Sequence, residues 1–381
     1  MTHVILPGGV RHELRDPPAL PPPVPFRSRV AYAAAHIVAD PRGENVPGAP
    51  AAIDWDATMA FRHHLWRHGF GVAEAMDTAQ RGMGLDYPAT RELILRSARE
   101  ASAVGGRLVA GVGTDQLPPG PVSLSHVTAA YEQQLEDVLA TGATPVLMCS
   151  RQLAAAAAGA EDYLKVYSGL IDQCTGPVML HWLGDMFDPA LSGYWGSTDL
   201  DEAAGTVLAL VDAHAERIDG IKVSLLDEAR EIALRRRLPG GVRLYTGDDF
   251  HYPQLIRGDE VGHSDALLGI FAAIAVPAAA ALAALDTGDL ARYDELFAPT
   301  VPLARHIFGP PTPSYKTGIV FLAWLAGHQD HFTMVGGLQS HRSARHLATL
   351  LVLADRAGVL PDPELAAQRA RAYFAVAAGE S

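Results

Sequence analysis

The sequence predicts an α/β protein built as a (β/α)8 barrel of the TIM type, followed by a C-terminal helical region. Three observations lead to this prediction. Short apolar runs alternate with longer amphipathic stretches over most of the chain. There are eight such runs, the number of parallel strands that closes this kind of barrel. After residue 286 the pattern becomes helical throughout.

The predicted strands and helices alternate strictly. The strands cover 29–38, 71–75, 107–113, 145–149, 177–181, 220–224, 243–247 and 265–269. The helices between them cover 56–68, 89–104, 127–140, 162–174 and 200–215. Strict alternation favours a parallel sheet whose carboxyl ends share one edge. An open, doubly wound sheet is the alternative, but no glycine-rich dinucleotide fingerprint follows the first strand.

Composition divides the chain into three parts. A proline-rich arm covers 1–28, the barrel 29–285 and the C-terminal helical region 286–381. In the last part we expect helices over 289–297, 301–307, 318–326, 343–357 and 363–378. The uncharged stretch 267–285 meets the length criterion for a membrane span. Because Gly269 and Pro277 interrupt it, we expect a buried strand and a buried helix instead, and no membrane association.

Overall composition excludes several classes of protein. With 49% hydrophobic residues among 381, the chain can form a sizeable core. Its net charge of −13 and the lack of a basic block argue against nucleic acid or anionic lipid as partners. The two cysteines, Cys149 and Cys174, predict reduced thiols, and no secretion signal is evident. We therefore expect a cytoplasmic protein.

Lysine is scarce in this sequence. Of 30 basic residues only Lys165, Lys222 and Lys316 are lysines. A lysine amine can lose its proton when buried, whereas an arginine cannot, so a lysine kept against this bias is a candidate for amine chemistry. Lys222 is the one at a predicted strand end, where a barrel keeps its catalytic residues. We interpret Lys165 as a surface residue and Lys316 as a structural one.

Apolar surroundings would lower the pKa of Lys222 and leave a neutral amine that attacks a carbonyl. An ion pair at the barrel mouth is an equal alternative. Two further signals lie at strand ends. Asp248 and Asp249 follow Gly247 and are candidates for binding hydroxyls, a metal or a base, with a helix N-cap as the alternative. His181 is a candidate acid or base, or a hydrogen-bonded core residue.

These residues resemble those of the dihydrodipicolinate synthase / N-acetylneuraminate lyase family of class I aldolases. The resemblance covers roughly residues 29–325 and rests on short motifs in the right order. These are 52–54 (AID), Gly69, 111–113 (GVG), 220–224 (GIKVS), 247–249 (GDD), 262–269 (GHSDALLG), Pro277, 285–289, 301–303 and 313–316. The resemblance implies a barrel with C-terminal helices, a Schiff base between Lys222 and a 2-keto acid or related carbonyl, no cofactor, and a homodimer or homotetramer.

Several family positions are altered here. The family's carboxylate-binding threonine motif falls on 76–80, where only Thr78 matches. The neighbouring Asp77 would repel a substrate carboxylate. The family's proton-relay tyrosine falls on His181, the tyrosine after the fourth strand is missing, and so is an arginine near Met186. Carboxylates accept hydrogen bonds from hydroxyls, which suggests a sugar-like substrate with fewer negative charges.

Three functions follow, in order of preference. The first is a Schiff-base lyase, an aldolase or dehydratase, acting on a keto sugar or 2-keto sugar acid. Lys222 would form the imine, His181 would move the proton and Thr78 would position the carbonyl. Substrate hydroxyls would be bound by Asp77, Asp185, Ser224, Gly247, Asp248 and Asp249. No metal is expected for this function.

The second function is a metal-dependent sugar isomerase or epimerase. Its ligands would come from carboxylates and histidines near strand ends, namely Glu74, Asp77, His181, Asp248 and His251. The third is a barrel that binds a sugar-like ligand without catalysis.

Overall fold

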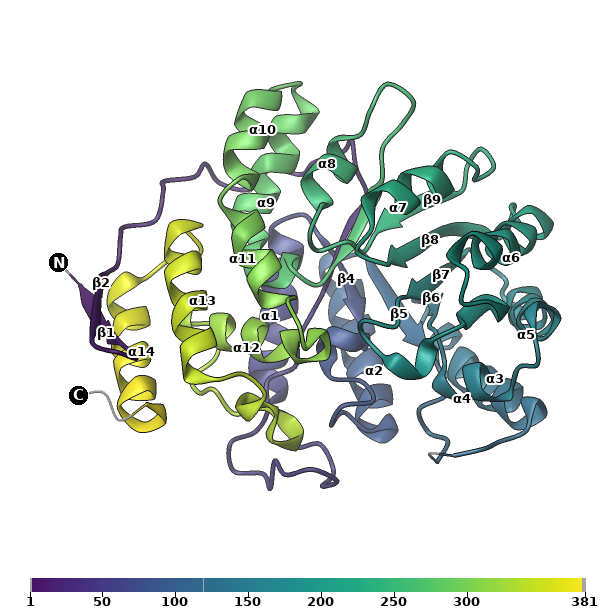
Figure 1. Cartoon of the computed structure of the whole chain (residues 1–381), viewed down its shortest axis with the longest axis horizontal. Coiled ribbons are helices and arrows are strands. Elements are labelled where there is room, and N and C mark those ends of the chain that lie inside the picture. Colours follow the sequence, from purple (N-terminus) through teal and green to yellow (C-terminus); the bar gives the residue numbers. More distant parts are fainter. Residues whose placement is uncertain (1, 119, 379–381) are drawn as a thin grey trace.

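Eight parallel strands close into a barrel in the computed structural model, which describes residues 2–118 and 120–378 (Figure 1). The strands follow one another in chain order, and the last pairs with the first. They are β3 (Ala31–Ala34), β4 (Gly71–Glu74), β5 (Leu108–Val112), β6 (Thr144–Leu147), β7 (Val178–Leu183), β8 (Ile218–Ser224), β9 (Arg243–Thr246) and β10 (Asp265–Leu268). The predicted (β/α)8 barrel is confirmed, and each strand overlaps one predicted run.

The barrel interior is filled by a small apolar cluster. Its strand residues come from seven of the eight strands, which only an interior position allows: Ala34, Ala73, Val109, Val146, Met179, Tyr245 and Leu267. Strand β8 contributes Gly220 instead, where a Cβ would lie 2.7 Å from the Tyr245 ring. Because side chains pack this interior, a ligand finds room only at the strand ends.

Helices cover the outside of the barrel. They are α1 (Trp55–Arg67), α2 (Tyr87–Val104), α3 (Leu124–Leu139), α4 (Arg151–Ala156), α5 (Ala160–Gln173), α6 (Leu200–Ala213), α7 (Glu228–Arg235) and α8 (Tyr252–Arg257). Several begin at an aspartate or serine that accepts a backbone hydrogen bond from the first turn. Asp54 accepts from Ala57 N and Asp86 from Ala89 N. Such caps satisfy donors that a helix leaves free at its start.

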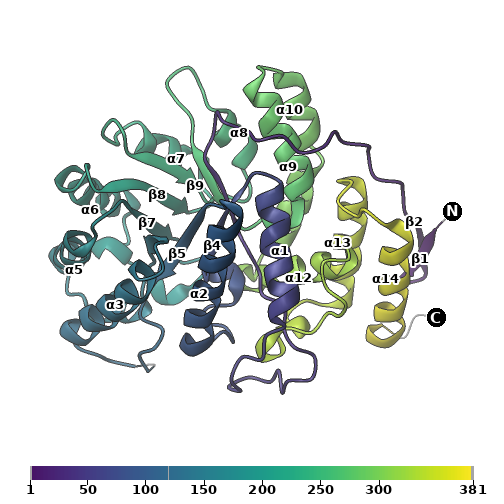
Figure 2. The same ribbon diagram turned by 180° about the vertical axis from the view of Figure 1, so that it is seen from behind.

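The C-terminal region adds α9 (Phe271–Asp286), α10 (Leu290–Phe297), α11 (Thr300–Ile307), α12 (Tyr315–Leu325), α13 (Ala344–Arg356) and α14 (Pro363–Ala377). Figures 1 and 2 show α12–α14 extending from the α1 side of the barrel. One hydrophobic core joins them to it, with Phe61 of α1, Phe271 of α9 and Leu350 of α13 among its buried members. Residues 379–381 of the predicted region lie outside the described residues.

The uncharged stretch 267–285 falls on the end of β10 and on α9, as expected. Its core-facing residues, such as Leu282, are fully buried. Within the described ranges, no helix combines the length and the apolar character that a membrane crossing requires.

The N-terminal arm contains a hairpin that the sequence did not predict. Strands β1 (His3–Leu6) and β2 (Val10–Glu13) pair in antiparallel fashion. The hairpin lies beside α14, and the rest of the arm runs across to the barrel (Figure 2). Asp355 of α13 holds it, because it accepts a hydrogen bond from Arg15 N at 2.8 Å and lies 3.1 Å from His12 Nε2. The strands are four residues each, too short for a clear pattern.

A buried ion pair ties β4 to the helices around it. Arg62 of α1 donates two hydrogen bonds to Glu74, at 2.8 and 2.9 Å, and neither side chain is exposed. Ser97 of α2 donates a third, at 2.5 Å. Glu74 follows the inward-facing Ala73, so its side chain points outward. The prediction that Glu74 is a metal ligand at the strand ends is therefore wrong.

We expect Glu74→Gln to destabilise the protein by about 3–5 kcal/mol, because it leaves the Arg62 guanidinium buried without its counter-charge. Urea unfolding followed by circular dichroism measures this loss. The matched control is Glu92→Gln, which removes the partner of Arg96 from a half-exposed pair on α2. It should change stability by less than about 1 kcal/mol. Equal losses for the two variants would contradict this account.

Candidate active site

Lys222 lies near the carboxyl end of β8, between His181 of β7 and Tyr245 of β9. The residue is 7% exposed. It lines a cavity of about 10 Å³, here called the lysine cavity, which has about the room that one water needs. The other walls are Ala34, Met76, Asp77, Thr78, Leu183, Phe187, Ser224, Asp249, Gly269, Phe308 and Tyr315.

Burial lowers the pKa of the Lys222 ammonium, because desolvation disfavours the charged form. Asp77 and Asp249 oppose this effect through space. Neither carboxylate forms a salt bridge with Lys222, and no hydrogen bond from its Nζ is found in the described part of the chain. The ion pair at the barrel mouth is therefore not the arrangement found. Burial therefore shifts the equilibrium of this amine toward its uncharged form, and the amine lines open space.

Gly247 makes room for this lysine. It is the residue directly after β9. A Cβ at this position would lie 2.8 Å from Lys222 Cε and 2.2 Å from Ser224 Oγ. Both distances are shorter than real Cβ contacts, so any side chain at position 247 would displace one of the two residues. The role of Gly247 is steric, since no other residue type leaves this volume free.

The two predicted aspartates have different positions. Asp249 lies on the wall of the lysine cavity and accepts a hydrogen bond from Ile270 N at 2.8 Å, at the start of α9. Burial raises its pKa to about 7. Asp248 instead accepts hydrogen bonds from the backbone of Phe250 and His251 and lies 2.9 Å from His251 Nδ1. Asp248 thus holds the turn before α8, close to the predicted N-cap alternative.

His181 is next to Lys222 but does not line the lysine cavity. Its ring is fully buried, and its Nε2 lies 3.3 Å from Ser224 Oγ. Burial lowers the pKa of His181 well below its usual value, and the Lys222 charge adds to this. No partner for its Nδ1 is found among the described residues. His181 is a neutral imidazole that reaches the cavity only through Ser224.

Thr78 lies on the cavity wall in the short helix η1 (Asp77–Ala79). Its Oγ1 is 2.9 Å from the hydroxyl of Tyr315, the first residue of α12. Sequence reasoning missed Tyr315 as a site residue. The available signal was its place in the matched segment 313–316, which gave Lys316 a structural role but no function to its neighbour.

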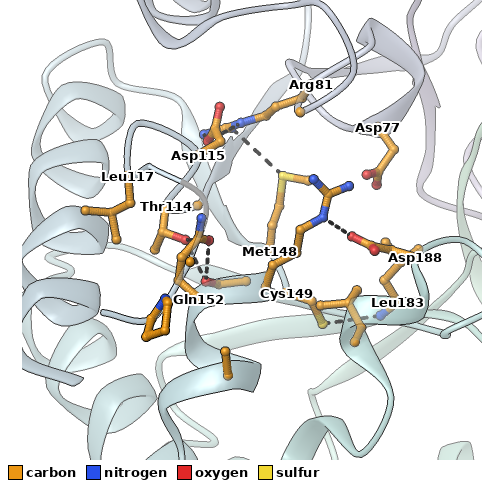
Figure 3. Close-up of a pocket in the computed structure, with 18 residues that line it drawn as sticks. Asp77, Arg81, Thr114, Asp115, Leu117, Met148, Cys149, Gln152, Leu183 and Asp188 are labelled. Atoms are coloured by element: carbon orange, nitrogen blue, oxygen red, sulfur yellow. Dashed lines mark hydrogen bonds and ion pairs between the residues drawn. The ribbon is translucent and has the colours of Figure 1, made fainter. Parts of the chain in front are cut away.

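A larger cavity of about 610 Å³, here called the outer cavity, shares Asp77 and Leu183 with the lysine cavity (Figure 3). Its polar lining comes mainly from the ends of β5 and β6 and the loop after β7: Asp77, Thr114, Asp115, Ser150, Arg151, Gln152 and Asp188. Cys149 also lines it, but burial raises the pKa of this thiol to about 12. Cys149 is therefore a neutral thiol and a poor nucleophile.

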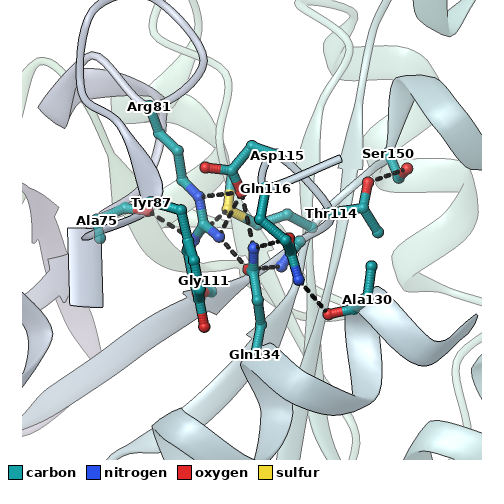
Figure 4. A network of polar contacts seen from close by, with 12 residues as sticks. Ala75, Arg81, Tyr87, Gly111, Thr114, Asp115, Gln116, Ala130, Gln134 and Ser150 are labelled. Carbon is teal, nitrogen blue, oxygen red and sulfur yellow. Dashed lines mark hydrogen bonds and ion pairs between the residues drawn. The ribbon is translucent and has the colours of Figure 1, made fainter. Parts of the chain in front are cut away.

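The cations of the outer cavity already have partners. Arg81 is buried and donates to Asp115 Oδ1, to the carbonyl oxygens of Ala75 and Gly111, and to Gln134 (Figure 4). Arg151 pairs with Asp188. Asp115 Oδ2, in contrast, is a buried acceptor without a partner within the described residues. The cavity thus offers free acceptors more than free cations.

The remaining predicted residues are dispersed. Asp185 is exposed in the loop after β7 and lines neither cavity. The proposed metal ligands do not form one site. Asp248 and His251 pair with each other, whereas Glu74 pairs with Arg62 on the outside of the barrel. Over residues 2–118 and 120–378, no three side chains of His, Cys, Asp or Glu are arranged to hold a metal ion.

Solved structures with the same fold are dihydrodipicolinate synthases and their relatives. A dihydrodipicolinate synthase of Bacillus anthracis has a TM-score of 0.64 at 16% identity, over 86% of this chain and 98% of its own. A prophage protein of that family from E. coli K12, solved with pyruvate, has a TM-score of 0.67 at 15% identity, over 86% of this chain and 98% of its own. The 4-hydroxy-tetrahydrodipicolinate synthase of Methylacidiphilum fumariolicum SolV has a TM-score of 0.66 at 17% identity, over 87% of this chain and 96% of its own.

At these identities the likeness shows a shared fold, which confirms the fold expected from the sequence resemblance. No curated protein matches the chain significantly in sequence. Residues 10–379 match the model of a family described as a protein of unknown function, DUF993, and the chain belongs to that family.

We expect Gly247→Ala to destabilise the protein by about 1–3 kcal/mol, because the added methyl group overpacks Lys222 and Ser224. Thermal unfolding measures the change. The control is Gly205→Ala on the exposed face of α6, where a Cβ would meet nothing within 4 Å. That variant should gain about 0.5–1 kcal/mol, since alanine is the better helix former. A Gly247→Ala variant as stable as the wild type would show that a side chain at position 247 does not displace Lys222 or Ser224.

Proposed function

We propose that the protein is a Schiff-base-forming lyase, an aldolase or dehydratase, that acts on a keto sugar or 2-keto sugar acid through an imine on Lys222. The observation that carries this proposal is the buried amine of Lys222. It lies at the carboxyl end of a barrel strand, without a salt bridge to any described residue, on the wall of a cavity that adjoins a larger one. The family relationship of the structural neighbours supports the reaction class.

The chemistry follows from the amine. Neutral Lys222 adds to a carbonyl carbon, and loss of water from the adduct gives a protonated imine. In an aldolase, the positive nitrogen accepts the electron pair of the C–C bond as that bond breaks. In a dehydratase, it accepts the pair of a C–H bond next to the imine carbon as that proton is removed, and the enamine then expels the beta oxygen as water. Hydrolysis of the imine returns the amine. The protein supplies the lysine and the groups that move protons, and this sequence of steps requires no cofactor.

The outer cavity favours a polyhydroxy substrate. The carboxylates of Asp77 and Asp115 line the outer cavity and are hydrogen-bond acceptors for hydroxyl groups, and Asp249 is a further polar group beside the lysine. Arg81 and Arg151 are each paired with a carboxylate, so neither is a free cation for a substrate acid. A neutral ketose fits this pattern better than pyruvate does. A homodimer or homotetramer is part of the same proposal and is tested by sedimentation.

Borohydride trapping tests the imine directly. The protein is incubated with pyruvate, 2-ketogluconate, dihydroxyacetone or D-fructose, reduced, and mapped by peptide mass spectrometry. We expect a ligand-dependent adduct on Lys222, with more labelling by the polyhydroxy ketones than by pyruvate. Lys222→Arg should abolish the adduct, whereas Lys165→Arg and Lys316→Arg should leave it unchanged.

Two results would contradict the proposal. An adduct on Lys316 that persists in Lys222→Arg would show that Lys316, and not Lys222, is the reacting amine. Ligand-dependent thermal stabilisation without any adduct would favour the non-catalytic, sugar-binding barrel.

A further inference from the structure

Tyr315 brings a phenol from the C-terminal region into the lysine cavity. It is 3% exposed, and its ring is fixed on two sides. The ring of Phe308 stacks on it at 4.4 Å between centroids, and that of Phe187 meets it edge-on at 6.2 Å. Lys316 Nζ lies 4.6 Å from the Tyr315 ring centroid. The hydroxyl therefore has a defined position beside Thr78.

The hydrogen bond between Tyr315 and Thr78 leaves one hydroxyl proton unused. When two hydroxyl groups form a hydrogen bond with each other, only one of their two O–H groups donates in it. Among the described residues, neither oxygen has another partner. Since both side chains line the lysine cavity, the second proton and the free lone pairs are available to a molecule bound there.

Other candidates for proton transfer are less well placed. His181 does not line the lysine cavity and contacts it only through Ser224. Asp248 is occupied by the turn before α8. Asp249 is on the wall, but its carboxylate accepts a hydrogen bond from Ile270 N. The wall residues with a side-chain hydroxyl are Thr78, Ser224 and Tyr315. Of these, only Tyr315 is a phenol, which is a much stronger acid than an aliphatic alcohol.

We propose that Tyr315 is a catalytic residue that relays a proton from the Lys222 nitrogen to the substrate carbonyl oxygen during imine formation. This inference rests on the proposed function, which it deepens. When the amine adds, the N–C bond forms and the carbonyl π pair moves to oxygen, which leaves an ammonium beside an alkoxide. The phenol gives its proton to the alkoxide while its oxygen accepts the proton from nitrogen, which yields a neutral carbinolamine.

The relay keeps the phenol neutral before and after the step. This agrees with burial, which raises the pKa of Tyr315 well above its usual value, an effect that nearby Asp77 increases. A free tyrosinate would be costly in this cavity, whereas a simultaneous exchange of protons avoids it. Thr78 holds the phenol in place and is a positioning residue.

The test is the rate of imine formation on Lys222 in single-turnover mixing with dihydroxyacetone, quenched with borohydride. We expect Tyr315→Phe to slow this rate about 100-fold, the usual contribution of a positioned acid or base. The concentration of dihydroxyacetone at half-saturation should change by less than about threefold. Added imidazole buffer should restore part of the rate, which a merely structural role would not produce.

Tyr252→Phe is the matched control, because its buried hydroxyl pairs with Thr300 away from both cavities. It should form the imine at the wild-type rate. Thr78→Val, which removes the partner of the phenol, should slow the step, whereas Thr78→Ser should not. These two variants test the relay independently if Tyr315→Phe is unstable.

Imine formation at the wild-type rate in Tyr315→Phe would overturn this inference and leave the lyase proposal standing. If wild-type Lys222 forms no imine with any carbonyl in the panel, the proposed function fails and the relay fails with it. The two failures are therefore distinguishable.

Discussion

The cost of burying an amine controls the chemistry that this barrel can perform. An apolar cluster fills the inside of the strands, and Lys222 occupies the rim, where it is shielded from water but has no salt bridge within the described part of the chain. Desolvation favours its neutral form, and the carboxylates of Asp77 and Asp249 only moderate this effect. The arrangement depends on Gly247, since a larger residue would take the volume that the lysine side chain needs.

The C-terminal helices complete the site. Phe308 and Tyr315 come from the end of α11 and the start of α12, and both form walls of the lysine cavity. A shared core fixes these helices to α1 and α9. The outer cavity, in contrast, is built from loops after the strands, where Arg81 and Asp115 hold one another. The lysine cavity and the outer cavity therefore depend on different parts of the fold.

The barrel could be predicted because its strands are local apolar runs, and Lys222 because its strand position follows from the same pattern. Contacts between distant residues could not be predicted. Tyr315 meets Thr78 across 237 positions, and no local pattern encodes that approach. Glu74 is the last residue of its strand, where a catalytic carboxylate is expected, yet its outward direction makes it a partner of Arg62. The N-terminal hairpin depends on α13 and α14, which lie at the other end of the chain.

The lowered pKa of Lys222 is the property on which the proposed chemistry depends, and the scarcity of lysine makes it measurable. Protein labelled with 13C at the lysine ε position gives three signals, which single Lys→Arg variants assign. We predict that the Lys222 signal titrates below the value of a free lysine, about 10.4. Asp77→Asn should lower this pKa further, because its carboxylate favours the ammonium. A Lys222 that titrates at or above the free value would contradict the account, because burial would then not favour the uncharged amine.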